Sequence, residues 1–146
     1  MESIHPLVVH FPIALLLTAL LLDFIAVGLK RPAFHRLALW NLTLGTLGAA
    51  TAVLTGLQAE DVAKHSFEIW KIMNLHERLG ITTLALGLLV VSYRLWRRDQ
   101  LSRRARLLTI VVMLIMSSTL GFGAYLGGRM VYEFGVGGSF GRSVHP

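Results

Sequence analysis

Two histidines stand at the start of long apolar segments of this chain of 146 residues. His10 opens the first apolar segment, and His76 opens the third. Alternate spans of a membrane protein begin at the same face, so both imidazoles are expected at one level near that face. Two imidazoles on different helices at one level are what a bis-histidine haem or a small metal site needs. The pair therefore predicts a cofactor site.

Other ligands could complete or replace this pair. The remaining imidazoles are His5, His35, His65 and His145. His5 and His65 fall on the same side as the pair, so they are the expected substitutes. A copper or other metal carrier would draw on His5, His10, His76 and Met130, because imidazole and thioether both suit copper. The structural alternative is that interfacial histidines only bond to headgroups, water or a neighbouring helix.

Small and basic residues are expected around His76. Gly80 and Gly87 follow it on one helical face, where they would leave room for a flat macrocycle or let two helices pack closely. Arg78 and Arg129 lie on the same side, where they could pair with haem propionates or reach out to headgroups. We therefore include Gly80, Arg78 and Arg129 in the predicted site. Similar small-residue stripes in the second and fourth apolar segments are expected to pack helices.

The composition places the chain in the membrane class. Hydrophobic residues make up 54% of it and charged residues 15%, with a mean hydropathy of +0.63. Soluble domains carry about a quarter charged residues. The chain has no cysteine, which excludes disulfides and thiolate or iron–sulfur sites. The net charge of +6 comes from basic clusters between apolar segments, so we expect no nucleic-acid partner.

Four apolar segments predict an all-α membrane bundle. A hydrocarbon core of about 30 Å needs roughly 20 apolar residues as helix. The segments cover residues 7–29, 37–57, 75–96 and 107–128 of one membrane domain, 1–146. The first segment is expected to be retained, because no basic region precedes it as in a signal peptide. No hydrolytic motif is present, so we expect no independent catalytic activity.

Charge in the connections predicts the orientation. Residues 30–36 carry basic side chains and no acid, and residues 94–106 are rich in arginine, with Asp99 as the one acid. Such connections stay in the cytoplasm, so both termini should face the periplasm of a bacterial inner membrane. Helical spacing from Val62 to Met73 predicts a short amphipathic helix at the interface between the second and third spans, either separate from the third span or continuous with it. The glycine-rich residues 129–146 predict an irregular tail.

Asp23 is an acid inside the first span, about 20 Å below His10. We expect a packing contact with Lys30, Arg36 or the start of the second span at Trp40 and Asn41. Met113 and Met116 fall in the middle of the fourth span and are expected in the core.

The opening from His5 to Leu16, which reads HPLVVHFPIALL, resembles the start of the bacterial membrane family called domain of unknown function 2231. Asp23, Thr55-Gly56, His76 and the tail from Gly127 to Tyr132 resemble that family as well. The resemblance covers essentially the whole chain and implies four membrane helices with histidines gathered on one side and a haem or redox role. Phe134 stands where the family tail usually has histidine, which removes a third imidazole.

These observations predict a membrane protein that binds haem b between His10 and His76 and transfers electrons. Its partners would be the lipid bilayer, a quinol and a periplasmic redox protein, within a homo-oligomer or a larger membrane complex. The alternatives are a non-catalytic subunit or assembly scaffold without a cofactor, and the copper-binding protein described above.

Overall fold

The chain is helical throughout the part that the structure describes. The computed structural model describes residues 5–60 and 67–136. Its helices are α1 (His5–Val8), α2 (His10–Leu29), α3 (Pro32–Glu60), α4 (Phe67–Trp96) and α5 (Arg103–Phe134). No strand occurs in the described ranges, which confirms the all-α class. The four helices from α2 to α5 are each long and apolar enough to cross a membrane.

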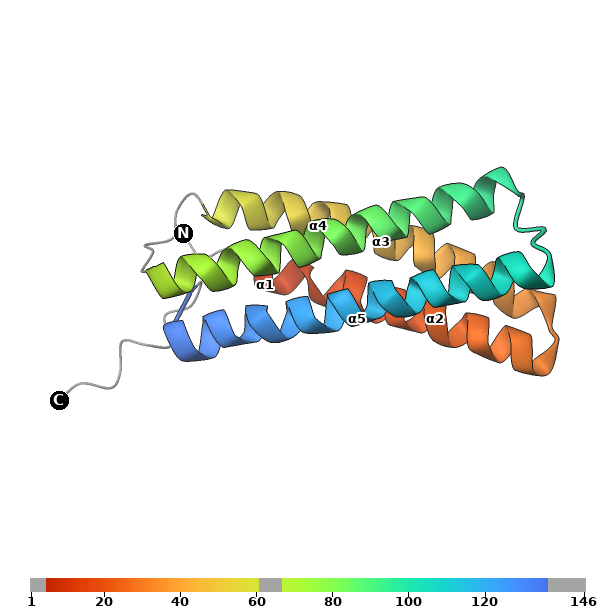
Figure 1. Ribbon diagram of the computed structural model, residues 1–146, viewed down its shortest axis with the longest axis horizontal. Coiled ribbons are helices and arrows are strands. Elements are labelled where there is room, and N and C mark those ends of the chain that lie inside the picture. Colours follow the sequence, from red (N-terminus) through yellow and green to blue (C-terminus); the bar gives the residue numbers. More distant parts are fainter. Residues whose placement is uncertain (1–4, 61–66, 137–146) are drawn as a thin grey trace.

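The long helices run side by side along one axis (Figure 1). α2 and α3 form one hairpin and α4 and α5 form another, and the hairpins meet through α3 against α4 and α2 against α5. Residues 30–31 and 97–102, which make the two hairpin turns, lie together at what we call the arginine end (Figure 1). α1, the start of α4 and the end of α5 lie toward the opposite, or histidine, end (Figure 1).

Pro12 separates α1 from α2. Proline lacks an N–H, and its ring clashes with the carbonyl four residues earlier, which here belongs to Val8. α1 ends at Val8 and α2 begins at His10, while the backbone bonds from Val9 to His5 (3.1 Å) and from Ile13 to Val9 (3.3 Å) bridge the break. A separate short helix therefore carries His5.

The outer surface of the bundle is apolar, as contact with lipid requires. Leu21, Leu47, Leu89 and Leu108 come from the four long helices, and each is more than half exposed. The interior is built from Leu16, Leu42, Val90, Met113 and Met116, each of which is 0% or 1% exposed. The prediction that both methionines belong to the core is confirmed.

The segments before the third span and after the fourth extend the long helices. From Phe67 onward, the expected amphipathic helix is continuous with the third span as the first part of α4, which is one of the two arrangements predicted, since neither glycine nor proline interrupts residues 67–79 and Met73 is buried. Residues 61–66 of that segment lie outside the described residues. The tail expected to be irregular from residue 129 stays helical to Phe134, because Met130 is buried in the bundle. α5 then ends at Gly135, whose positive φ of 65° suits glycine.

Small residues of α3 and some of those of α5 allow close packing. A Cβ atom on Gly45 would lie 2.8 Å from Leu16 Cδ2, so a larger residue there would displace a buried side chain. In α5, Cβ atoms on Gly123 and Gly127 would lie 3.5 Å from Leu79 and 3.2 Å from His76 of α4. In α5, nothing lies within 4 Å of the Cβ position of Gly121 or Gly128, and Ala124 is exposed. This face of α5 points away from the described helices. At Gly121, Ala124 and Gly128, the stripe expected to pack helices therefore meets none of the described helices closely.

Candidate functional site

At the histidine end, the structure brings His5 of α1 against His76 of α4. Their ring centroids are 6.1 Å apart, and the ring planes are nearly perpendicular, at 89°. Both α2 and α3 lie between these residues in the sequence, so only the tertiary fold brings the two rings together. His5 was predicted only as a substitute ligand, whereas His76 was one of the two primary candidates.

The His5 ring is held by the last turns of α3. Its Nδ1 lies 3.1 Å from Thr55 Oγ1. The same hydroxyl lies 3.0 Å from the carbonyl of Thr51 and 3.1 Å from that of Ala52, to either of which it can donate. Gly56 makes room for the ring, because a Cβ atom there would lie 3.1 Å from His5 Cε1. Thr55 and Gly56 therefore position the His5 ring.

The His76 ring is held by α5 in a matching way. Its Nδ1 lies 2.8 Å from the carbonyl oxygen of Gly123, which can only accept, so Nδ1 carries the proton. Gly127 leaves space beside the ring, since its Cβ atom would lie 3.2 Å from His76 Cε1. In its neutral form, the His76 ring therefore carries its lone pair on Nε2. Histidine ligands of metals are oriented by hydrogen bonds of this kind.

Burial lowers the pKa of His5 below its ordinary value of 6.5, and charge repulsion from His76 acts in the same direction. A hydrogen bond with the backbone of Ala52 opposes this shift. The environment therefore favours the neutral imidazole of His5, which is the form that binds metals.

The other residues of the predicted site are distributed differently. His10 is the exposed first residue of α2, and Arg78 is exposed on α4. Arg129 is paired with Glu133 one turn along α5, at 2.7 Å. His65 lies outside the described residues.

The glycine stripe below His76 packs helices. A Cβ atom on Gly87 would lie 2.8 Å from Thr46 Oγ1 of α3, and one on Gly80 would lie 3.8 Å from Val53. Between these glycines, the hydroxyls of Thr83 and Thr119 are 3.0 Å apart and join α4 to α5. Of the two purposes expected for this stripe, close packing of helices is the one observed.

At the arginine end, a second polar cluster surrounds Asp23. Its Oδ2 accepts from Arg94 Nη1 at 2.6 Å, and its Oδ1 lies 2.7 Å from His35 Nδ1. The side chains of Asp23 and Arg94 are 1% and 0% exposed. The expected packing contact of Asp23 with the start of the second span is made by His35, in the first turn of α3. The residues named for the contact, Lys30, Arg36, Trp40 and Asn41, are wrong, because the acid faces the bundle interior, where Arg94 of α4 meets it.

Arg94 extends this cluster across the bundle. Its Nε donates to Asp99 Oδ1 at 2.9 Å, and its Nη2 donates to the carbonyl of His35 at 2.9 Å. Arg106 in turn donates from Nη2 to the carbonyl of Asp99 at 3.0 Å. Every long helix contributes at least one residue, so the network ties the arginine end together.

Sequence reasoning missed Arg94 because it precedes a run of arginines that orient the chain, and so it was counted with them. A signal was present: Arg94 lies one turn after Val90 and two turns after Gly87, on the face of α4 that is buried. A basic residue that continues a buried stripe can be recognised as a partner for an acid in another span.

Apolar helices of spanning length, with polar groups gathered at both ends of the bundle, define an integral membrane protein. The chain belongs to the family described as predicted membrane protein DUF2231, whose model matches residues 1–139. No curated protein and no solved structure matches the chain. The family match confirms the resemblance inferred from the opening motif.

Proposed function

We propose that this protein binds a haem b through His5 and His76 and transfers electrons across the histidine end of the bundle. The contact between these two rings is the observation that carries the proposal. His5 replaces His10 in the ligand pair expected from the sequence, because His5 faces His76 and His10 is exposed on α2.

The number of donors favours haem over a bare metal ion. Structural zinc sites use about four protein ligands, whereas haem supplies its own equatorial nitrogens and needs two axial ligands at most. No group of three or more histidine or carboxylate side chains that could hold a metal ion occurs within residues 5–60 and 67–136. Two imidazoles therefore suit a haem better than they suit an ion alone.

The ring spacing agrees with a shared ligand. An ion bonded to one nitrogen of each ring, at about 2 Å from both, separates the ring centres by about 6 Å at most. The observed 6.1 Å is compatible with that geometry. Thr55 and the Gly123 carbonyl orient the rings, and burial, by lowering the pKa of His5, favours its neutral form. When bound, the haem would supply one-electron redox chemistry, with a quinol and a periplasmic redox protein as the proposed partners.

The test is an absorption spectrum of protein purified in detergent after expression with ample haem. We expect a Soret band that shifts on reduction with dithionite. His5→Gln and His76→Gln should each reduce the haem content at least tenfold, because each removes an axial ligand. His10→Gln and His35→Gln are the matched controls and should retain it. Thermal melting of each variant verifies that it is folded.

Two results would overturn this proposal. One is wild-type protein without haem, and the other is loss of haem in His10→Gln with retention in His5→Gln, which would return the ligand role to His10.

A scaffold without a cofactor is the second candidate. The hydrogen bonds of the rings join α1 to α3 and α4 to α5, and they are also what a purely structural pair would make. For a scaffold, the variant with both His5→Gln and His76→Gln should recover the same membrane partners from cross-linked cells as wild type. The copper alternative gains some support from Met73 and Met130, which are both buried toward this end. Metal analysis of the purified protein distinguishes a copper-binding protein from a haem protein.

A further inference from the structure

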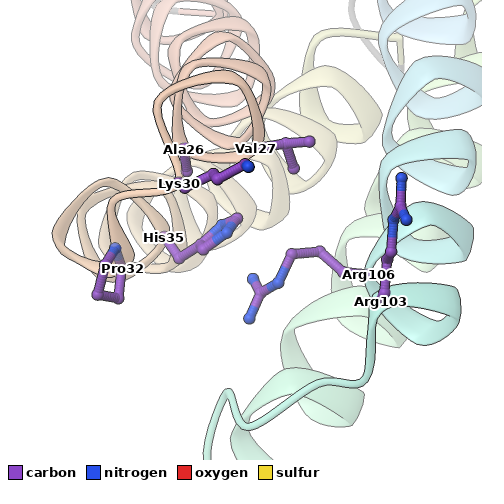
Figure 2. A pocket seen from close by; sticks show the side chains of 7 residues that line it. All are labelled: Ala26, Val27, Lys30, Pro32, His35, Arg103 and Arg106. Atoms are coloured by element: carbon purple, nitrogen blue, oxygen red, sulfur yellow. The ribbon is translucent and has the colours of Figure 1, made fainter.

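A cavity of about 530 Å³ lies at the arginine end, apart from the histidine pair. Its lining comes from the α2–α3 hairpin and from the start of α5, namely Ala26, Val27, Lys30, Pro32, His35, Arg103 and Arg106 (Figure 2). Figure 2 shows the Arg106 side chain extending from α5 across the cavity toward His35. No acidic side chain is among these lining residues.

The cavity carries uncompensated positive charge. In the adjacent network, the carboxylates of Asp23 and Asp99 face the guanidiniums of Arg94 and Arg106, so these charges cancel formally. Within the part of the chain that the structure describes, neither Lys30 nor Arg103 has an ion-pair partner. These two cations remain on the cavity wall.

Arg106 also has unused hydrogen-bonding capacity. Its Nη1 is buried and lies 3.6 Å from Asp99 Oδ1, within ion-pair range but beyond a hydrogen bond. A buried charged N–H without an acceptor is costly, and an anion in the cavity would accept from it. Arg and Lys donors that line one cavity are the usual partners of phosphate oxygens.

We propose that this cavity binds the phosphate headgroup of an anionic phospholipid. The cavity lies between the α2–α3 hairpin and the start of α5. It therefore adjoins the outer, apolar surfaces of α2 and α5. Phe24 lies one turn before Val27, and Leu107 lies one turn after Arg103, on the same faces; both are about half exposed. Acyl chains can follow these apolar side chains while the headgroup meets the cations. A free phosphate would make no use of this adjoining surface.

The experiment uses delipidated full-length protein in a neutral detergent. Phosphatidylglycerol, phosphatidylcholine and inorganic phosphate are added separately, and bound lipid is counted by native mass spectrometry while thermal stability is followed in parallel. The test variant is Lys30→Gln with Arg103→Gln. The matched control is Arg31→Gln with Arg104→Gln, which removes the same charge from neighbouring exposed positions that do not line the cavity.

We expect phosphatidylglycerol to bind and stabilise the protein, with phosphatidylcholine bound at least tenfold more weakly. The Lys30/Arg103 variant should lose about tenfold or more in affinity for phosphatidylglycerol, since each cation near an anionic headgroup contributes about fivefold. In the Arg31/Arg104 variant, the affinity for phosphatidylglycerol should change less than twofold. Equal losses of phosphatidylglycerol affinity in the two variants would overturn the proposal, because they would mean that the lipid is attracted by the overall positive charge of this end and not by the cavity. Displacement of the lipid by an equal concentration of inorganic phosphate would overturn it as well.

Discussion

At the scale of single residues, the two ends of the bundle use histidine differently. His5 and His76 each direct Nδ1 to an oxygen of a neighbouring helix. His35 instead directs Nδ1 to the buried carboxylate of Asp23. The oxygens at the histidine end are neutral, whereas the oxygen that faces His35 belongs to a carboxylate.

The lowered pKa of His5 predicts a pH dependence of stability. Because the pKa is lower in the folded protein than in the unfolded chain, the unfolded state binds more protons below pH 6.5. The melting temperature in detergent should therefore fall as the pH is lowered from about 6.5, and His5→Gln should reduce this slope. His10→Gln is the control, and an unchanged slope in His5→Gln would contradict the prediction.

Asp23→Asn should destabilise the protein strongly. It leaves the buried guanidinium of Arg94 without one of its two carboxylates, and removing one partner of a buried pair costs about 3–5 kcal/mol. We expect a large fall in melting temperature or in the yield of folded protein. Glu133→Gln breaks an exposed pair with Arg129 and should have little effect. Similar losses of stability in Asp23→Asn and Glu133→Gln would mean that the buried pair of Asp23 with Arg94 contributes no more than an exposed pair.

At the scale of elements, glycine decides how closely α3 and α4 approach. Gly87 faces Thr46, whose hydroxyl is buried and donates to the carbonyl of Leu42 at 2.7 Å. Gly121 of α5 faces open space. Glycine therefore serves contact between helices at Gly87 of α4 and at Gly127 of α5, beside His76, but not at Gly121.

Gly87→Ala should destabilise the bundle by about 1–3 kcal/mol, because the added methyl overlaps a buried side chain that cannot move away. Gly121→Ala, the matched control, should be neutral or slightly stabilising, since alanine favours helix. Thermal melting of the purified variants measures both. Thr46→Ala combined with Gly87→Ala should recover part of the loss; failure to recover would show that the overlap with Thr46 is not its cause.

At the scale of the whole molecule, the charge of the connections gathers at one end. Both hairpin turns of the arginine end carry basic residues (Figure 1). Under the positive-inside rule, this end should face the cytoplasm and the histidine end the periplasm. The proposed lipid site and the proposed haem site would then belong to opposite leaflets.

The orientation can be tested cleanly because the chain has no cysteine. Glu68→Cys at the start of α4 and Gln100→Cys between α4 and α5 place single thiols at exposed positions of the two ends. In intact spheroplasts, a membrane-impermeant maleimide should label Glu68→Cys and leave Gln100→Cys unlabelled until the membrane is opened. The reverse pattern would invert the proposed topology.

The sequence alone predicted the number of spans, the all-α class, the family and the burial of Met113 and Met116. These features could be predicted because a chain can cross the lipid bilayer only as a long apolar helix, and the length of an apolar segment can be read directly from the sequence. Asp23 was recognised as unusual for the same reason.

Only the tertiary structure decided which polar groups meet. The break at Pro12 gives His5 its own helix, and Gly56 and Gly127 leave space beside the two imidazoles. Asp23 meets Arg94 because α2 and α4 turn those faces inward. Hydropathy gives the depth of a residue in the membrane, whereas the rotation of each helix about its axis is set by side-chain packing. Contacts between spans depend on that rotation, so they appear only once the helices are packed.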